Sequence, residues 1–191
     1  MLKIIQAPAA VLSQQAEAVT VIDKSIKNLL KEMEETLTAA SDPEGVGLAA
    51  PQVDKSLQIF IVKQSAKSPL LTFINPKIEN FFNEEEKSSE AKSASGGQKR
   101  KKKSVQLEGC LSLKDIWGVV KRHHGVLLSY QDATGAKHTE KFRGFLATII
   151  QHEIDHLEGH LFTKRVLEQS NQLYHSVKNQ KGETEFEEID L

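Results

Sequence analysis

The chain has little cysteine and almost no net charge. Its 191 residues include a single cysteine, Cys110, and its 25 lysines and arginines face 26 aspartates and glutamates, for a formal net charge of -1. A lone cysteine cannot form an internal disulfide, which indicates a reducing compartment and leaves the thiol available to bind a metal or act as a nucleophile. The near-neutral charge gives no overall reason to expect a nucleic-acid-binding protein.

Long hydrophobic runs are also absent. No segment approaches the roughly 20 apolar residues that cross a bilayer, and residues 1–8 lack the apolar stretch of a secretory signal. With 39% hydrophobic and 27% charged residues, the composition is that of an ordinary globular protein. We therefore expect a cytoplasmic monomer without a membrane partner.

Residues 23–37 predict an N-terminal helix. Asp23 is a typical N-cap, and the apolar residues after it recur with the 3.6-residue period of a helix that buries one face. These are Ile26, Leu29, Leu30, Met33 and Leu37. Nothing in this segment carries chemistry, so we interpret the helix as part of the core.

Short segments rich in β-branched and aromatic residues, separated by turn residues, predict strands. They cover residues 57–62, 70–78, 118–123, 126–131 and 137–142. Toward the end of the chain the patterns weaken. The pattern at 166–177 is compatible with a further helix, and the acidic residues that dominate 179–191 predict a loose tail outside a single domain, 1–178.

The composition changes abruptly between residues 83 and 104. This segment carries seven lysines and arginines against four glutamates, with serines and glycines between them. Because it has almost no apolar surface to bury, we predict a flexible charged insertion. A sharper hypothesis is that its basic run contacts RNA or the ribosome. The run consists of Lys99, Arg100, Lys101, Lys102 and Lys103.

A glycine-rich segment extends from Glu44 to Gln52. It has neither the lysine and hydroxyl residue of a P-loop nor the spacing of a dinucleotide-binding fingerprint, which disfavours phosphate binding. Glycine also allows a peptide-like ligand to approach the backbone closely, because it has no Cβ atom. We favour this second interpretation, in which Gln52 adds an amide donor.

The most informative stretch is an HExxH sequence, His152 to His156, within an apolar run that begins at Phe145. In a helix the two histidines lie one turn apart, and Glu153 lies on the same side. Two imidazoles in this arrangement can bind a divalent metal, while the carboxylate between them serves as a proton carrier at the open coordination position. The plainer alternative is a helix with two polar neighbours.

A catalytic metal needs a third ligand, for which Cys110 is the candidate. Taken alone, a single cysteine is most often a small buried apolar residue. A thiolate with two imidazoles, however, makes a sound three-ligand set that leaves a fourth position open to water. Its place in a short loop, in a chain with a separate HExxH sequence, favours the ligand interpretation.

Three short motifs, in this order, resemble those of the peptide deformylase family: GVGLAAPQ at 45–52, EGCLS at 108–112 and QHEIDH at 151–156. The resemblance extends over nearly the whole chain. It implies removal of the formyl group from the N-terminal formyl-methionine of newly made bacterial or organellar proteins. We expect an α+β fold in which antiparallel strands pack around the HExxH helix, together with the N-terminal helix.

The resemblance also implies one divalent metal ion, usually Fe²⁺, with Zn²⁺, Ni²⁺ or Co²⁺ as alternatives. Its implied ligands are Cys110, His152 and His156. Hydroxide bound to the metal would attack the formyl carbon, with Glu153 moving the proton and with Gln52 and the backbone N–H of Leu111 donating to the oxyanion. The implied borders of the substrate, a nascent formyl-methionyl peptide, are Gly45, Val46, Gly47, Glu108 and Gly109.

Two positions depart from the family pattern. Lys114 stands where a proline is common, and Trp117 stands where many members have an arginine that helps to hold the peptide. Both departures bear on substrate affinity. Two other function classes stay open: a zincin-type metallopeptidase, disfavoured because such enzymes generally use histidine or glutamate as third ligand, and an inactive RNA- or ribosome-binding protein that depends on Lys99 to Lys103.

Overall fold

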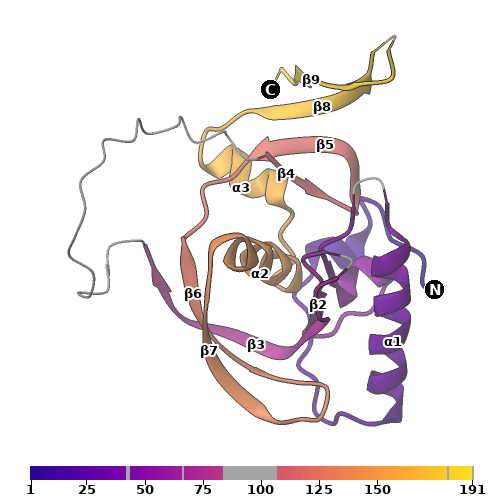
Figure 1. The fold of residues 1–191 in the computed structure, drawn as a ribbon, viewed down its shortest axis with the longest axis vertical. Coiled ribbons are helices and arrows are strands. Elements are labelled where there is room, and N and C mark those ends of the chain that lie inside the picture. Colours follow the sequence, from indigo (N-terminus) through magenta and orange to yellow (C-terminus); the bar gives the residue numbers. More distant parts are fainter. Residues whose placement is uncertain (42–43, 66, 84–106, 180, 191) are drawn as a thin grey trace.

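The computed structural model describes residues 1–41, 44–65, 67–83, 107–179 and 181–190 (Figure 1). It shows an α+β fold of antiparallel sheets with a few helices, as the sequence predicted. The predicted insertion, 83–104, lies outside the described residues except for Asn83. None of the helices in the described ranges has the length and apolar character needed to cross a membrane.

The larger sheet has five strands in the order β1-β2-β3-β6-β7, with antiparallel neighbours. Its strands are β1 (Gly47–Ala49), β2 (Ile59–Val62), β3 (Leu71–Phe82), β6 (Gly125–Gln131) and β7 (Lys137–Arg143). Four of the five predicted strands are therefore confirmed, with shifted ends. β1, which carries part of the glycine-rich segment, was not predicted as a strand.

Helices cover both faces of this sheet. Successive side chains of a strand point to opposite faces, and all four residues of β2 are buried. Ile59 and Ile61 pack with α1 (Lys24–Ala39), whereas Phe60 and Val62 pack with α2 (Gly144–Leu157). The sheet thus fixes the position of α2, the helix that carries the HExxH sequence.

The N-cap predicted for α1 is confirmed, and the end of α2 is closed by a glycine. The Asp23 carboxylate caps α1 by accepting hydrogen bonds from the backbone N–H groups of Ser25 (2.8 Å) and Ile26 (3.1 Å). At the end of α2, Gly159 has a φ of +73°, the left-handed conformation that commonly closes a helix. A Cβ atom there would lie 2.8 Å from the backbone of Ser13, so no other residue fits.

The smaller sheet has the order β4-β5-β8-β9 and lies on the other side of α2 (Figure 1). Its strands are β4 (Leu107–Cys110), β5 (Leu113–Val119), β8 (Leu173–Lys178) and β9 (Thr184–Glu188). The short α3 (Phe162–Glu168) packs beneath it, and two 3₁₀ helices, η1 (Ala10–Ser13) and η2 (Ala50–Val53), complete the regular elements of the described chain.

The sequence interpretation was wrong in three places around this sheet. The strand expected at 118–123 is β5, which begins at Leu113 because it pairs with β4 directly after a tight turn. The helix expected at 166–177 ends with α3 at Glu168, and β8 follows. The tail expected to be loose contains β9, which forms a hairpin with β8 around the side chain of Asn179, an acceptor for the N–H groups of Lys181 and Glu183.

Candidate metal centre and active-site cleft

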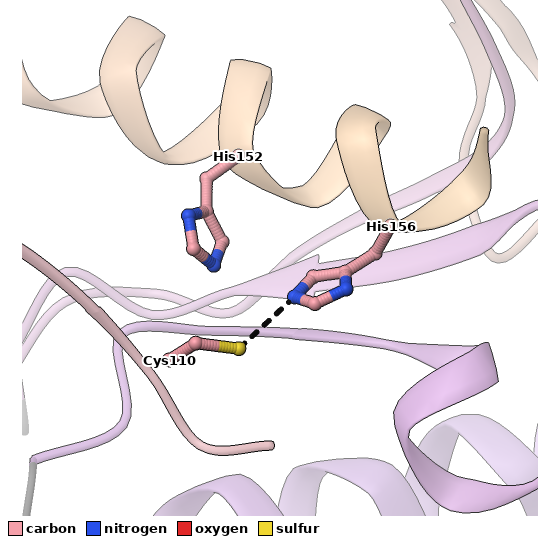
Figure 2. Close-up of side chains that lie close together, drawn as sticks. All are labelled: Cys110, His152 and His156. Carbon is pink, nitrogen blue, oxygen red and sulfur yellow. Dashed lines mark hydrogen bonds between the residues drawn. The ribbon is translucent and has the colours of Figure 1, made fainter. Parts of the chain in front are cut away.

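Three side chains suited to metal binding meet beside α2. Cys110 ends β4, whereas His152 and His156 lie one turn apart on α2. Their ligand atoms all lie within 4.8 Å of one another, and Cys110 Sγ is 3.2 Å from His156 Nε2 (Figure 2). The structure therefore brings together the three residues that the sequence indicated as metal ligands.

The chemistry of these donors fits a divalent transition metal. Glu108 Oε2 is 3.2 Å from His152 Nδ1, and because an ionised carboxylate only accepts hydrogen bonds, this nitrogen carries the proton. Nε2 of His152 is then free to bind a metal. Burial alone raises the pKa of the Cys110 thiol, but His156 and His152 lower it to about 5, which favours the thiolate at neutral pH.

Glu153 lies next to the three candidate ligands and is only 3% exposed. Among the described residues, its Oε2 atom has no hydrogen-bond partner. Burial raises the pKa of this carboxyl to about 7, against the opposing effect of the two histidines. A buried carboxyl with a raised pKa is typical of groups that transfer protons.

Gly47 of β1 provides the space that the Glu153 carboxylate occupies. A Cβ atom at Gly47 would lie 2.3 Å from Glu153 Oε1 and 2.9 Å from Ile149 Cγ2. Contacts this short do not occur, so any side chain at this position would displace the carboxylate. The glycine-rich segment and the HExxH sequence are therefore complementary in shape.

Gln52 approaches the candidate ligands from η2. Its Oε1 accepts a hydrogen bond from the backbone N–H of Ala49 (2.8 Å), which directs the amide nitrogen toward Cys110 Sγ at 3.5 Å and Ser112 Oγ at 3.3 Å. Leu111 follows Cys110 in the turn between β4 and β5 and lines the same cleft. Both residues indicated as oxyanion donors thus lie beside the candidate metal centre.

The centre opens onto a cleft with a cavity volume of about 220 Å³. All five residues expected to border a substrate line it: Gly45, Val46, Gly47, Glu108 and Gly109. The sequence interpretation did not single out Glu44, Leu107, Phe145, Thr148 and Ile149, which also line it. Phe145, Thr148 and Ile149 precede His152 at helical spacing, so the period of the HExxH segment could have found them.

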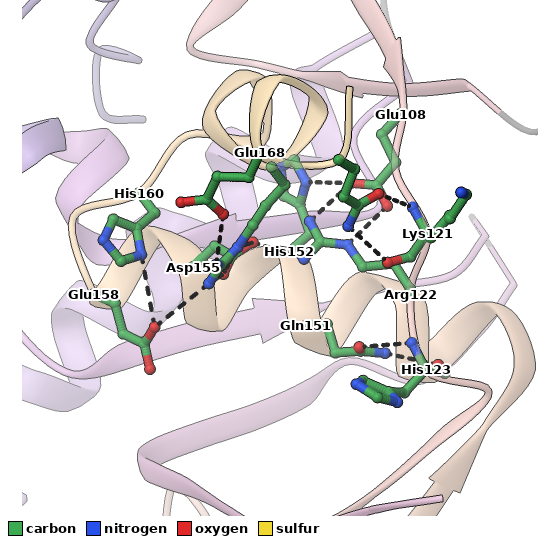
Figure 3. Close-up of polar contacts among 12 residues, drawn as sticks. Glu108, Lys121, Arg122, His123, Gln151, His152, Asp155, Glu158, His160 and Glu168 are labelled. Atoms are coloured by element: carbon green, nitrogen blue, oxygen red, sulfur yellow. Dashed lines mark hydrogen bonds and ion pairs between the residues drawn. The ribbon is translucent and has the colours of Figure 1, made fainter. Parts of the chain in front are cut away.

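A network of ion pairs lies behind His152, and we call it the back network (Glu108, Arg122, Asp155 and Arg165). Figure 3 shows Glu108, Arg122 and Asp155 of this network near His152. Arg122 donates to both oxygens of Glu108, each at 2.9 Å, and to Asp155 Oδ2 at 2.6 Å. Arg165 donates to Asp155 Oδ1 at 2.7 Å. Burial raises the pKa of Glu108, but hydrogen bonds from His152 and Arg122 outweigh it, so the pKa falls below its usual range.

Glu108 therefore has a second contact role that the sequence did not reveal. It borders the cleft, as expected, but its carboxylate also holds the ring of His152. A further group of possible metal ligands, Asp155, Glu158 and His160, lies at the end of α2. Because both oxygens of Asp155 accept hydrogen bonds from arginines, we assign no metal to this group.

The two departures from the family pattern have different positions. Lys114 is exposed on β5 and does not line the cleft. Trp117 does line it, and its indole ring covers Gly109, where a Cβ atom would lie 2.8 Å from the ring. Trp117 thus forms part of the wall opposite β1.

Comparison with known proteins gives a consistent result. The sequence model of the family described as polypeptide deformylase matches residues 1–172. Peptide deformylase 1 of Bacillus cereus is 38% identical over 166 residues, which cover 87% of this chain and 92% of that protein. The peptide deformylase of Campylobacter jejuni is 38% identical over 170 residues, which cover 86% and 85% of the two chains.

Solved structures agree. The peptide deformylase of Thermotoga maritima gives a TM-score of 0.69 at 31% identity and covers 86% of this chain and 97% of its own. The peptide deformylase of Synechococcus elongatus, solved in complex with actinonin, gives 0.69 at 33% identity and covers 86% and 78%. Motifs, fold and relatives agree that the chain belongs to the polypeptide deformylase family.

Proposed function

We propose that the chain hydrolyses the formyl group of N-terminal formyl-methionine in nascent peptides and releases formate. The observation that carries this proposal is the meeting of Cys110, His152 and His156 beside the buried carboxylate of Glu153, whose Oε2 has no hydrogen-bond partner among the described residues, at a cleft. Membership of the family makes the chain a metal-dependent enzyme. The roles of the individual residues are part of the proposal.

Cys110, His152 and His156 would hold the metal, and we propose Fe²⁺, although Zn²⁺, Ni²⁺ and Co²⁺ suit the same donors. When bound, a divalent ion supplies Lewis acidity toward the formyl oxygen and makes water a better nucleophile at neutral pH. The back network keeps the His152 ring in place through Glu108. Metal analysis after anaerobic purification tests the identity of the ion.

Glu153 moves the proton in this mechanism. It accepts a proton from the attacking water and returns it to the amine nitrogen when the C–N bond breaks. A pKa of about 7 suits this exchange, because the carboxylate gains and loses a proton with little cost near neutral pH.

Gln52 and the backbone N–H of Leu111 stabilise the negative charge that develops on the formyl oxygen. The amide of Gln52 is already oriented by Ala49, so little reorganisation is needed during the reaction. The peptide backbone lies between Gly45, Val46 and Gly47 on one side and Glu108 and Gly109 on the other, as an added strand beside β1.

Formate release from formyl-Met-Ala-Ser, measured with and without a chelator, tests the function. We expect release that the chelator abolishes and added Fe²⁺ restores. Cleavage of internal peptide bonds instead would indicate a metallopeptidase, and neither reaction would indicate a binding protein. Cys110 as third ligand favours the deformylase.

We also propose a ribosome contact through the basic run Lys99, Arg100, Lys101, Lys102 and Lys103, which lies outside the described residues. Supporting it are the charge of the run and a substrate that emerges from the ribosome. Replacing the five residues by glutamine should reduce co-sedimentation with ribosomes at low salt, because fewer counterions are released. Turnover of a short peptide should stay the same. A cytoplasmic monomer fits this setting.

A further inference from the structure

The N-terminal segment contacts both parts of the chain from which the proposed oxyanion donors come. The backbone N–H of Ile5 donates to the carbonyl of Gln52 at 2.8 Å, and that of Ala7 donates to the carbonyl of Ser112 at 3.0 Å. Gln52 lies in η2, whereas Ser112 lies in the turn between β4 and β5. The segment therefore joins two regions that are 60 positions apart, and we call it the N-terminal brace (residues 5–7).

Gln6, between these two contacts, adds a hydrogen bond from its side chain. Its Nε2 donates to the carbonyl oxygen of Leu111 at 2.9 Å, although the two residues are 105 positions apart. That carbonyl shares one planar peptide unit with the N–H of Ser112, which donates to Cys110 Sγ at 3.4 Å. The Gln6 amide thus holds one edge of a peptide unit whose other edge faces a candidate metal ligand.

The turn that carries the Leu111 N–H has little freedom of its own. It consists of Leu111 and Ser112 alone, because Cys110 already pairs with Leu113 across it. The N–H of Leu111 lies in the preceding peptide unit, which the Leu111 Cα atom joins to the unit held by Gln6. Only the two torsions of Leu111 relate these units, so fixing the second unit restricts the direction of the N–H in the first.

Folding stability does not account well for the contact of Gln6. Its side chain is exposed, and a hydrogen bond that competes with water adds little to the free energy of unfolding. The turn is already held by the backbone N–H of Ala7 and by Ser112, which is 0% exposed. What Gln6 adds is a restraint on the direction of one peptide unit beside the candidate metal centre.

We propose that Gln6 is a positioning residue for the reaction and that it keeps the Leu111 N–H directed toward the developing oxyanion. The inference rests on the proposed deformylase function, in which this N–H and Gln52 are the two donors. Because Ile5 holds the backbone of Gln52 from the other end of the brace, the brace sets both donors relative to each other. Donors that are oriented beforehand need no reorganisation when charge develops, so their misplacement lowers the rate of the chemical step.

Gln6→Met tests this role in the metal-loaded protein with formyl-Met-Ala-Ser as substrate. Methionine has a similar length but no donor, so we expect kcat to fall about three- to tenfold, the factor that the net contribution of one hydrogen bond allows. KM should stay nearly the same, because the formyl oxygen gains its negative charge only in the transition state. Gln6→Glu should lower kcat further, since its carboxylate would face the Leu111 carbonyl.

Gln6→Lys is the rescue variant, because its ammonium group can donate to the same carbonyl, and it should keep most of the original kcat. Gln15→Met is the matched control: Gln15 is exposed in the same N-terminal segment and takes no part in the brace. It should keep both kinetic constants. Melting temperature and metal content should be unchanged in all these variants, since the brace keeps its backbone hydrogen bonds.

An NMR measurement on the zinc-loaded protein reports on the contact without turnover. The amide nitrogen shift of Ser112 responds to hydrogen bonding at the Leu111 carbonyl, because both groups belong to one peptide unit. This shift should move in Gln6→Met, return toward its original value in Gln6→Lys and stay unchanged in Gln15→Met.

A kcat in Gln6→Met equal to that of Gln15→Met would overturn the inference, and so would a higher KM at unchanged kcat, which would indicate a role in substrate binding. A loss of kcat that Gln6→Lys does not restore, or that follows melting temperature or metal content, would overturn it as well. Absence of formate release from the unmodified protein would overturn the proposed function and this inference together. Normal release with an unaffected Gln6→Met variant would overturn the positioning role alone.

Discussion

His152 separates two regions of opposite character. Behind it, all four carboxylate oxygens of Glu108 and Asp155 in the back network accept hydrogen bonds. In front of it, Glu153 Oε2 and His156 Nδ1 are buried and lack a partner among the described residues. The carboxylates of Glu108, Asp155 and Glu153 are all buried, so burial does not explain the difference.

The comparison distinguishes the residues that orient the His152 ring from the residues that take part in the reaction. A buried charge is costly unless it is paired, and the back network meets this condition with two arginines. Such a network can hold a ring in one orientation but has no free group with which to react. The Glu153 carboxyl has an oxygen without such a partner among the described residues, so its burial remains energetically unfavourable. An unfavourable local arrangement of this kind is expected where a protein carries out chemistry.

Replacing Glu153 by glutamine should have the largest effect on turnover. The amide keeps the shape of the side chain but cannot accept a proton, so we expect kcat to fall by roughly 10²- to 10⁴-fold. Metal content should stay full, and the melting temperature should not fall, because a buried unpaired carboxyl is removed. Turnover at the original rate would exclude Glu153 from the mechanism. Kinetics and metal analysis on one preparation measure both.

Replacing Cys110 by serine should reduce turnover by weakening metal binding. A hydroxyl is a harder and less acidic ligand than a thiol, so the protein should retain much less metal after dialysis. Activity should decline in proportion to metal content. If the serine variant purifies with a full complement of metal, the third ligand must lie elsewhere.

Alanine at Gly47 should test whether the free position of the Glu153 carboxylate matters. Its Cβ atom would push the carboxylate away, and a displacement of about 1 Å can cost roughly 100-fold in rate. Metal content should not change. The double variant Gly47→Ala with Glu153→Gln is the control: if the alanine acts through Glu153, it should add little to the loss caused by glutamine alone. Additive losses would contradict this mechanism.

The sequence predicted Glu153, Cys110 and Gly47 as site residues because they lie in short continuous motifs. The helices α1 and α2 were found in the same way, from local periods and from caps such as Asp23. Local sequence patterns could not predict the back network, because Arg122 and Asp155 are 33 positions apart and only the fold brings them together. Glu108 was assigned to the cleft, but its contact with His152 depends on the same long-range packing.

The β8–β9 hairpin shows a second limit of sequence interpretation. Val166 and Leu173 are both buried and are seven positions apart, which imitates a helical period. The helix instead ends at Glu168, Ser170 has a φ of +51°, and the Asn171 side chain donates a hydrogen bond to the Val119 carbonyl. All residues of β9 are exposed, so the alternation that normally identifies a strand is missing, and pairing with β8 alone defines it.

Glutamine at Glu108 should show how the back network supports the metal. The amide cannot accept hydrogen bonds at both positions now bound by Arg122, and His152 loses a carboxylate partner. We expect metal affinity to fall by about 10- to 100-fold, with a lower melting temperature of the metal-free protein and a small change in kcat per bound metal. Chelator competition measures the affinity. An unchanged affinity would show that Glu108 does not orient His152.

Lysine at Arg165, the outer end of the back network, should have the smallest effect. Arg165 is 30% exposed and binds Asp155 through two of its nitrogens, a fork that lysine cannot form. Asp155 keeps its bond to the more deeply buried Arg122. We therefore expect a loss of roughly 1 kcal/mol or less in unfolding free energy, with metal content and kcat/KM unchanged.

Lys164→Ala provides the matched control, because this neighbour is 49% exposed and reaches Glu168 only at 3.9 Å. It should leave the melting temperature unchanged, whereas Arg165→Lys should lower it slightly. A large loss of metal or turnover in Arg165→Lys would mean that the back network affects the metal ligands and Glu153 more strongly than its contacts indicate. Normal metal content and a slightly lower melting temperature would show that the coupling to His152 weakens along the network, and that Glu108 and Arg122 carry most of it.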